Sequence, residues 1–138
     1  MPVFRFRVYW EEDDLIYRDI EILTAQSFLD FHKAIYTAFE FDGKHNAFFY
    51  ESNDRGQRLR ALSSEVLSNK RDAPALSMLK TPVAALVSAP DQKFIYVYDP
   101  LKNWTFLVEL ISILEHEESQ KLIHLHYVKK VWLRNNTI

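Results

Sequence analysis

Apolar and polar residues alternate in two neighbouring segments close to the N-terminus, residues 3–10 and 15–23. A period of two is typical of a strand with one buried face, so the pattern predicts two strands. Joined through a loop tip at residues 12–14, the strands form an antiparallel hairpin in which apolar pairs and opposite charges agree on one register. This register pairs Phe4 with Ile22, Phe6 with Ile20, Trp10 with Ile16, Arg5 with Glu21 and Arg7 with Asp19.

Arg18 is an exception on the apolar face of this hairpin, because the register places it opposite Val8. A guanidinium keeps its charge at any ordinary pH, so it cannot enter an apolar environment as a neutral group. We therefore expect Arg18 to pair with a carboxylate, to bind main-chain carbonyls, or to open onto a cleft that admits an anion.

Residues 27–41, SFLDFHKAIYTAFEF, have the apolar spacing of an amphipathic helix. Ser27 and Asp30 resemble a capping box at its start, and His32 lies within the apolar stripe. The segment FDGKHN ends the helix, and AFFYE, residues 47–51, reads as a third strand. The stripe predicted to face the sheet consists of Phe28, Phe31, Ile35 and Phe39.

From about residue 52 to residue 80 the chain is polar and has no clear hydrophobic period. A connection of that length inside one domain is usually a flexible excursion, a lid or a partner-binding loop, and we expect a flexible excursion. The following segment TPVAALVS suits a short second helix with Pro82 in its first turn.

Aromatic residues are concentrated in residues 93–110, KFIYVYDPLKNWTFLVEL. We predict strands from Phe94 to Tyr98 and from Trp104 to about residue 114, around a turn at DPLKN. Pairing Tyr98 with Trp104 and Tyr96 with Phe106 makes an aromatic ladder on one face. Such a ladder is either core or a platform for bases or sugars, and the apolar residues on both faces favour core, with Trp104 buried against Tyr98.

The last pattern, LIHLHYVKKVWL, predicts a final strand that completes a C-terminal meander. As an open sheet edge, it is a possible site of homodimer formation. The elements together predict a single α+β domain over residues 1–138. Its mixed or antiparallel sheet has an N-terminal hairpin and a C-terminal meander, with one main helix and a short second helix packed on it.

The composition narrows the class of protein further. The 138 residues fit one domain, and the formal charge of −2 gives no general attraction to nucleic acid or anionic lipid. The chain has no cysteine, which excludes disulfides and thiolate zinc sites. Charges interrupt every apolar run, and the first ten residues do not resemble a signal peptide. We therefore expect a soluble cytoplasmic protein that does not bind membranes.

Three segments resemble motifs of the plasmid pRiA ORF-three-like family. The segment TAQSFLDFHKAIYTAFEFDGKHNAFFY resembles its apolar-x-x-apolar-His helix and aromatic-Asp step with a following histidine. Tyr17 with RDIEI resembles its Trp-Arg-Arg-Ile strand, which matches Arg18 to the first arginine of that motif. FIYVYDPLKNWTFLVEL resembles its Tyr-Asp-Phe-Gly-Asp-x-Trp-x-His signature at Tyr98, Asp99 and Trp104. The likeness covers most of residues 3–114.

The resemblance implies an α+β sheet-and-helix domain and brings no established activity with it. The sequence departs from the family pattern where PLKN replaces Phe-Gly-Asp-x, where Phe106 stands in place of a histidine, and in lacking a cysteine-containing tail. Some members carry labels that link them to insertion elements, including a resolvase-like name. A serine recombinase needs a serine nucleophile among arginines, and the N-terminal strand has arginines without one.

Five polar residues coincide with the family motifs and are the candidate site residues. They have two interpretations: a buried ion pair and a core histidine, or a polar cleft in which Arg18 binds an anion and a histidine moves protons. Asp42 and Asp99 are the acids expected to partner Arg18. The candidates are Arg18, His32, Asp42, His45 and Asp99.

His124 and His126 alternate on the last predicted strand and are spaced to share a zinc ion, with His116 as a third ligand. Alternating histidines on an exposed strand are commoner than metal sites, so we expect neither a metal nor another cofactor.

Three functions remain open from the sequence. A non-enzymatic binding or interaction module with an unknown protein or small-molecule partner is favoured. The first alternative is a small hydrolase-like enzyme using Arg18, His32 and Asp99. The second is a nucleic-acid-associated accessory protein of a mobile element, for which RGQRLR and VKKVWLR supply basic residues without a recognised module.

Overall fold

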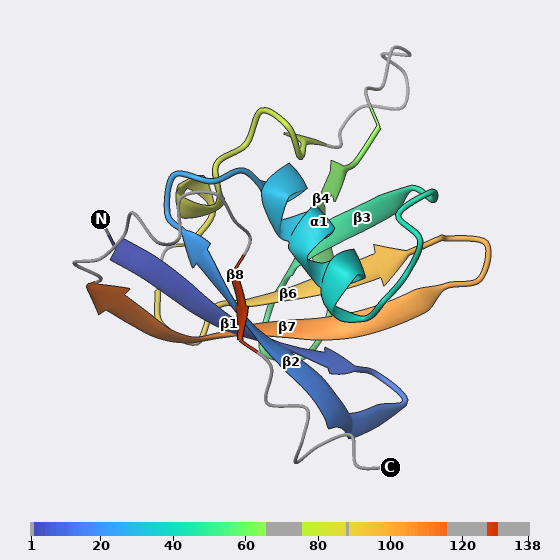
Figure 1. The fold of residues 1–138 in the computed structure, drawn as a ribbon, viewed down its shortest axis with the longest axis horizontal. Helices are drawn as coiled ribbons and strands as arrows, with labels where there is room; N and C mark the ends of the chain where they lie inside the picture. The colour runs from blue at the N-terminus through green and yellow to red at the C-terminus, as the bar shows by residue number, and fades with distance from the viewer. Residues whose placement is uncertain (1, 66–75, 88, 116–126, 130–138) are drawn as a thin grey trace.

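A mixed β-sheet of eight strands forms the centre of the fold in the computed structural model, which describes residues 2–65, 76–87, 89–115 and 127–129 (Figure 1). The strand order is β5-β4-β3-β6-β7-β1-β2-β8. All neighbours are antiparallel except β4 and β5, which are parallel. The predicted α+β class is confirmed. The strands are β1 (Pro2–Trp10), β2 (Asp13–Leu23), β3 (Ala47–Ser52), β4 (Arg58–Ser63), β5 (Leu76–Ser77), β6 (Lys93–Tyr98), β7 (Trp104–Glu115) and β8 (Tyr127–Lys129).

The N-terminal hairpin has the predicted register over most of its length. Phe4 lies opposite Ile22 and Val8 opposite Arg18, as the alternation of apolar residues requires. The prediction for the tip was wrong, because Trp10 pairs with Asp13 and not with Ile16. The register shifts between the last two residues of β1, and β2 begins at Asp13, which leaves a turn of residues 11 and 12.

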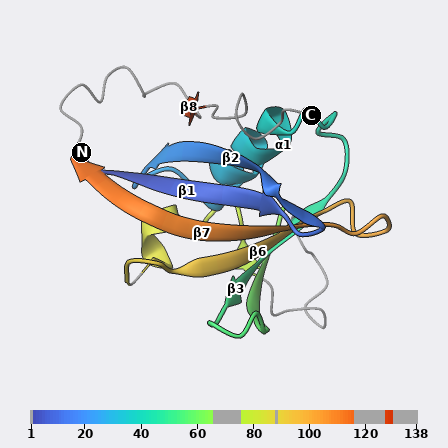
Figure 2. The ribbon, with the colours of Figure 1, turned by 90° about the horizontal axis from the view of Figure 1, so that it is seen from below.

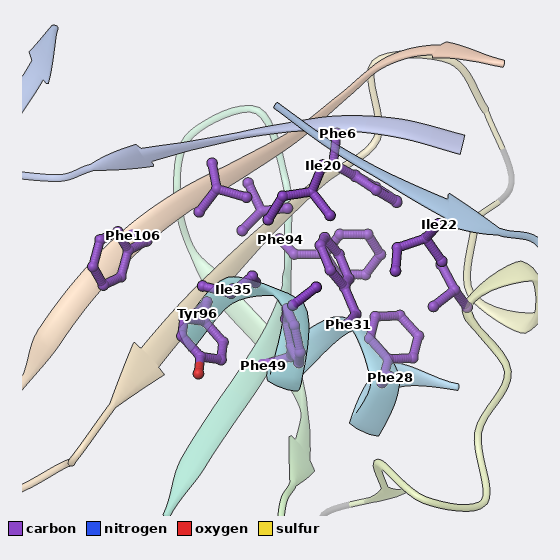
Figure 3. Close-up of a cluster of buried hydrophobic side chains, with 14 of the residues drawn as sticks. Phe6, Ile20, Ile22, Phe28, Phe31, Ile35, Phe49, Phe94, Tyr96 and Phe106 are labelled. Carbon is purple, nitrogen blue, oxygen red and sulfur yellow. The ribbon is translucent and has the colours of Figure 1, made fainter. Parts of the chain in front are cut away.

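The helix α1 (Phe28–Ala38) packs across one face of this sheet (Figures 1 and 2). Ser27 and Asp30 form the predicted capping box, in which each side chain accepts from the other residue's main-chain N–H. Phe31 lies between Phe6 and Phe49, with ring centroids 4.6 and 5.2 Å away, so that rings from helix and sheet interdigitate (Figure 3). No helix among the described residues is both long and apolar enough to cross a membrane.

Strands β6 and β7 have the predicted pairing, with Tyr98 opposite Trp104 and Tyr96 opposite Phe106. Residues 94–98 are buried on both faces, as expected of a central strand. The prediction that Trp104 is buried was wrong, because this side chain is 37% exposed. The aromatic ladder is therefore core along most of its length and reaches the surface at its end.

Two strands that the sequence pattern did not predict, β4 and β5, lie in the polar segment 52–80. Leu62 of β4 is fully buried, and Met78 just after β5 is buried as well, so these parts of the segment belong to the core. Residues 66–75 lie outside the described residues, and the flexibility of the segment stays a prediction. The predicted second helix is a single 3₁₀ turn, η2 (Val83–Ala85), because Pro82 precedes it in extended conformation.

The final strand β8 pairs with β2, so that the hairpin β1–β2 lies between β8 and β7. The predicted meander therefore does not continue from β7 to β8, because the strand adds to the outer edge of the hairpin. Strands β5 and β8 form the two edges of the sheet, and dimer formation through an edge stays a prediction.

Candidate functional site

An open aromatic groove lies at the end of the sheet where three segments meet. These segments are the tip of the β1–β2 hairpin, the loop after α1 and the start of β7 (Figures 1 and 2). The groove has a volume of about 320 Å³, and five of its six lining side chains are aromatic. They are Trp10, Ile16, Phe39, Phe41, Trp104 and Phe106.

The rings of the groove form a continuous series. Phe41 stacks on Tyr98, with centroids 4.5 Å apart and ring planes 10° apart. Phe41 therefore occupies the place over Tyr98 that the ladder would give to Trp104. The Trp104 ring instead lies between Phe41, at 5.5 Å, and Trp10, at 5.9 Å. Trp104 is also the first residue of β7, so one side of its ring faces solvent.

Arg18 lies beside this groove and binds the end of α1. Its Nε donates to the main-chain carbonyl of Ala38 at 3.2 Å, and its Nη1 donates to the carbonyl of Tyr17 at 2.9 Å. The guanidinium carbon lies 4.9 Å from the centre of the Phe39 ring, which lines the groove. Burial lowers the pKa of Arg18, and the charge of Glu40 opposes that effect. Among the environments expected for Arg18, these contacts bear out the main-chain carbonyls.

A polar cluster of His45, Asp42 and Asp99 adjoins the same ring series. The Nε2 of His45 is 3.9 Å from Oδ1 of Asp42, and its Nδ1 is 3.6 Å from Oδ2 of Asp99. The hydroxyl of Tyr98 donates to Oδ1 of Asp42 at 2.9 Å, and the Lys44 N–H donates to the same oxygen. These two donors, the Lys44 N–H first, lower the pKa of Asp42.

His32, a residue of α1, is buried in a different environment. Its Nδ1 lies 2.7 Å from the Tyr96 hydroxyl, and its ring meets Tyr36 edge-on at 5.0 Å. Burial, with a smaller effect from Lys33, lowers the pKa of His32 to about 4. The imidazole is therefore neutral at pH 7 and acts as a hydrogen-bonded core residue.

The structure brings three of the five sequence candidates together and leaves two apart. Asp42, His45 and Asp99 form one cluster, whereas Arg18 binds the end of α1 and His32 binds Tyr96. The weak metal candidates His116, His124 and His126 lie outside the described residues. Within the described part of the chain, no group of three or more acids and histidines is arranged to hold a metal ion.

A larger cavity, of about 380 Å³, lies on the sheet face opposite α1. Two pairs of its lining side chains bind each other: Lys93 lies 3.5 Å from Asp54, and Tyr9 donates to Glu109 at 3.1 Å. The aromatic groove is smaller, but it adjoins the polar cluster and exposes the larger rings. We therefore take the groove as the candidate site.

The sequence did not reveal the groove, because its patterns place Trp10 and Trp104 on faces predicted to be buried. Trp10 and Trp104 stand at strand ends beside the polar segments EEDD and DPLKN, where a large ring has solvent on one side. Phe41 lies in the segment that ends the helix and was not assigned to a face. Aromatic residues next to two turns that meet at one sheet end are the signal that would have found the site.

These features define a small α+β domain with one helix on a mixed sheet and an aromatic groove at the sheet end. The chain belongs to the family of plasmid pRiA4b ORF-3-like proteins, whose family model matches residues 3–129. This match confirms the resemblance seen in the sequence motifs.

A solved structure has the same fold. It is the crystal structure of MM3350, a protein of unknown function from Methanosarcina mazei Go1, with a TM-score of 0.72 and 24% sequence identity. The alignment covers 92% of this chain and 66% of that chain, so this chain spans just under two thirds of its length. No curated protein matches the sequence.

Proposed function

We propose that the protein is a non-enzymatic binding module that takes a segment of a partner protein into the aromatic groove. The observation that carries the proposal is the exposure of Trp104 and its position between Phe41 and Trp10 in an open groove. Tryptophan is enriched at protein interfaces because it buries a large area with few rotatable bonds. A surface that exposes such rings gains contact area when an apolar segment covers them.

The charges around the groove favour a basic protein segment over a nucleic acid. Acidic residues lie next to the groove in two places. Residues 11–14, EEDD, follow Trp10 and are exposed. Glu40 and Asp42 flank Phe41 in the sequence. This arrangement repels phosphate and attracts lysine or arginine. The basic candidates on β4 have partners elsewhere, since Arg60 pairs with Glu51 and Arg58 lies over the Tyr50 ring.

The polar candidates support a binding role over a hydrolase-like one. An enzyme using Arg18, His32 and Asp99 needs these three groups at one substrate. Arg18 is hydrogen-bonded to carbonyls, His32 to Tyr96, and Asp99 lies near His45, so each has a partner that accounts for it structurally.

A library of displayed random dodecapeptides tests the proposal. Peptides enriched on the purified protein are synthesised and titrated against the wild type, the Trp104→Ser variant and a Leu59→Ser control. Leu59 is also an exposed apolar residue, but it lies on β4, with β3 and β6 between it and β7.

We expect enriched peptides to lose roughly tenfold or more in affinity with Trp104→Ser and to keep it with Leu59→Ser. Circular dichroism confirms that both variants are folded. Enriched peptides that bind all three proteins equally, or no enrichment at all, would show that the groove is not a peptide-binding surface.

A further inference from the structure

We infer that the segment bound in the groove is a proline-rich polyproline II helix that carries arginine or lysine. This inference rests on the proposed function and names the chemistry of its partner. It is drawn from three features of the groove: its aromatic lining, the unused donors of its tryptophans and the acids at its rim.

The rings contact one another at tilted angles, and the groove is lined by the ring surfaces that these contacts do not cover. The Trp10 and Trp104 rings are 5.9 Å apart with planes at 38°, and Trp104 and Phe41 are 5.5 Å apart at 53°. Rings at these separations are in contact, so a ligand packs on the ring surfaces that line the groove and not between the rings. Proline rings pack on such exposed aromatic surfaces, and aromatic-lined grooves are the usual receptors of polyproline II segments.

The indole N–H groups of Trp10 and Trp104 indicate that the ligand has accessible carbonyls. Neither group has a hydrogen-bond partner among the described residues. An indole N–H is a donor only, so it needs an acceptor when a ligand covers it. A polyproline II helix makes no internal hydrogen bonds, and its carbonyls are all available as acceptors.

The acidic residues at the rim of the groove indicate that the bound segment carries a positive charge. The exposed segment EEDD, residues 11–14, begins directly after Trp10, so a cation next to a proline bound at that ring meets several carboxylates. A cation is also favoured over the rings themselves. The protein already contains such a contact at the groove, where Arg18 lies 4.9 Å above Phe39.

The size of the groove excludes bulkier modes of peptide binding. A volume of about 320 Å³ is at the small end of ligand sites. An amphipathic helix places anchors over several turns and needs a longer apolar channel than six side chains supply. An extended segment that contributes a few proline rings fits the space.

Titration calorimetry with matched synthetic ligands tests the inference. The main probe is a proline decapeptide with an arginine at each end. Its controls are the same peptide with terminal glutamates, a glycine-serine decapeptide with terminal arginines, an oligothymidylate and a cello-oligosaccharide. The first two controls separate charge from proline, and the last two test the other ligand classes that stack on aromatic rings.

Three variants locate the contacts. Trp104→Phe keeps a ring and removes the N–H, and the double variant Glu11→Gln, Glu12→Gln removes charge from the rim. Glu115→Gln is the matched control, because this acid is exposed at the far end of β7 from Trp104.

We expect the arginine-capped decaproline to bind roughly tenfold more tightly than either control peptide. Trp104→Phe weakens binding, the rim variant reduces the difference between arginine and glutamate caps, and Glu115→Gln changes neither. Equal binding of the glycine-serine peptide, preferential binding of the oligothymidylate or the sugar, or binding unaffected by Trp104→Phe would overturn the inference.

The two proposals fail in different ways. If the random library yields groove-dependent peptides that lack proline and the decaproline does not bind, the binding module stands and its partner is of another class. If no peptide of either kind depends on Trp104, the binding function itself is wrong.

Discussion

The guanidinium of Arg18, on β2, donates a hydrogen bond to the main-chain carbonyl of Ala38, the last residue of α1. The last turn of α1 contains no basic residue of its own. The strand thus supplies the positive charge that a helix C-terminus favours, and it satisfies a carbonyl that the helix leaves without a partner. This contact explains why a charged residue interrupts the apolar face of the hairpin.

Replacing Arg18 should therefore destabilise the fold. We expect Arg18→Met to lower the free energy of unfolding by about 1–3 kcal/mol, because a hydrogen bond from a charged donor is lost at the helix end. Arg18→Lys should recover only part of the loss, since an ammonium has no planar fork to reach two carbonyls. Urea denaturation measures both variants. Unchanged stability of Arg18→Met would show that the helix end does not need this charge.

His32 should make the protein sensitive to mild acid. Its pKa is about 4 in the folded state, below its ordinary value of 6.5, so the unfolded chain takes up the proton first. The stability that neutral His32 contributes is fully present above pH 6.5 and is lost as the pH falls towards 4. At pH 4.5 the free energy of unfolding should be lower by about 2–3 kcal/mol.

The contribution is isolated by comparing variants across pH. Urea denaturation of the wild type and His32→Gln at pH 7 and pH 4.5 gives the difference, in which the carboxylates common to both proteins cancel. We expect the wild type to lose more stability than His32→Gln between the two pH values. Equal losses in the wild type and His32→Gln would mean that His32 titrates normally in the fold.

The sequence predicted those parts of the fold that follow from local alternation. The hairpin register, the capping box of α1 and the pairing of Tyr96 with Phe106 all arise from residues close together in the chain. Strand β4 was not predicted, because only its last residues are buried and its first three are exposed. A strand at the margin of a sheet has too few buried positions to show a period.

The candidate site was predicted less well, because it depends on contacts between distant segments. Asp42 and His45 were identified from motifs, but their meeting with Asp99 requires the loop after α1 to reach the β6–β7 turn. Likewise, Trp104 and Tyr98 are opposite one another in the ladder, but the ring that stacks on Tyr98 is Phe41, from the loop after α1. No alternation within a strand contains that information.

The exposure of Trp104 leads to a stability prediction that differs from that for a core ring. Trp104→Ala should cost about 1–2 kcal/mol, because the ring loses aromatic contacts with Trp10 and Phe41 but leaves little cavity. Phe31→Ala should cost about 3–5 kcal/mol, since that side chain is fully buried between helix and sheet. Urea denaturation gives the ranking. A loss of 3 kcal/mol or more for Trp104→Ala, on the order seen for core aromatics, would mean that its ring is core after all.

The loop that carries Phe41 should depend on Gly43. Gly43 has φ +74°, and an added Cβ would lie 2.6 Å from Cε1 of Tyr36. An alanine there costs about 1–2 kcal/mol for its backbone conformation. The Tyr36 ring must also move, and its contacts with His32 and Tyr98 move with it.

Gly56 provides the matched control for this prediction, because its φ is +77° and no atom lies within 4 Å of an added Cβ. Gly56→Ala therefore measures the backbone cost alone, and Gly43→Ala should cost roughly 1–3 kcal/mol more in urea denaturation. Because Phe41 is two residues from Gly43, that variant should also weaken peptide binding in the groove, whereas Gly56→Ala should not. Equal stability and binding of the two variants would mean that Tyr36 adjusts freely and that the loop does not fix the position of Phe41.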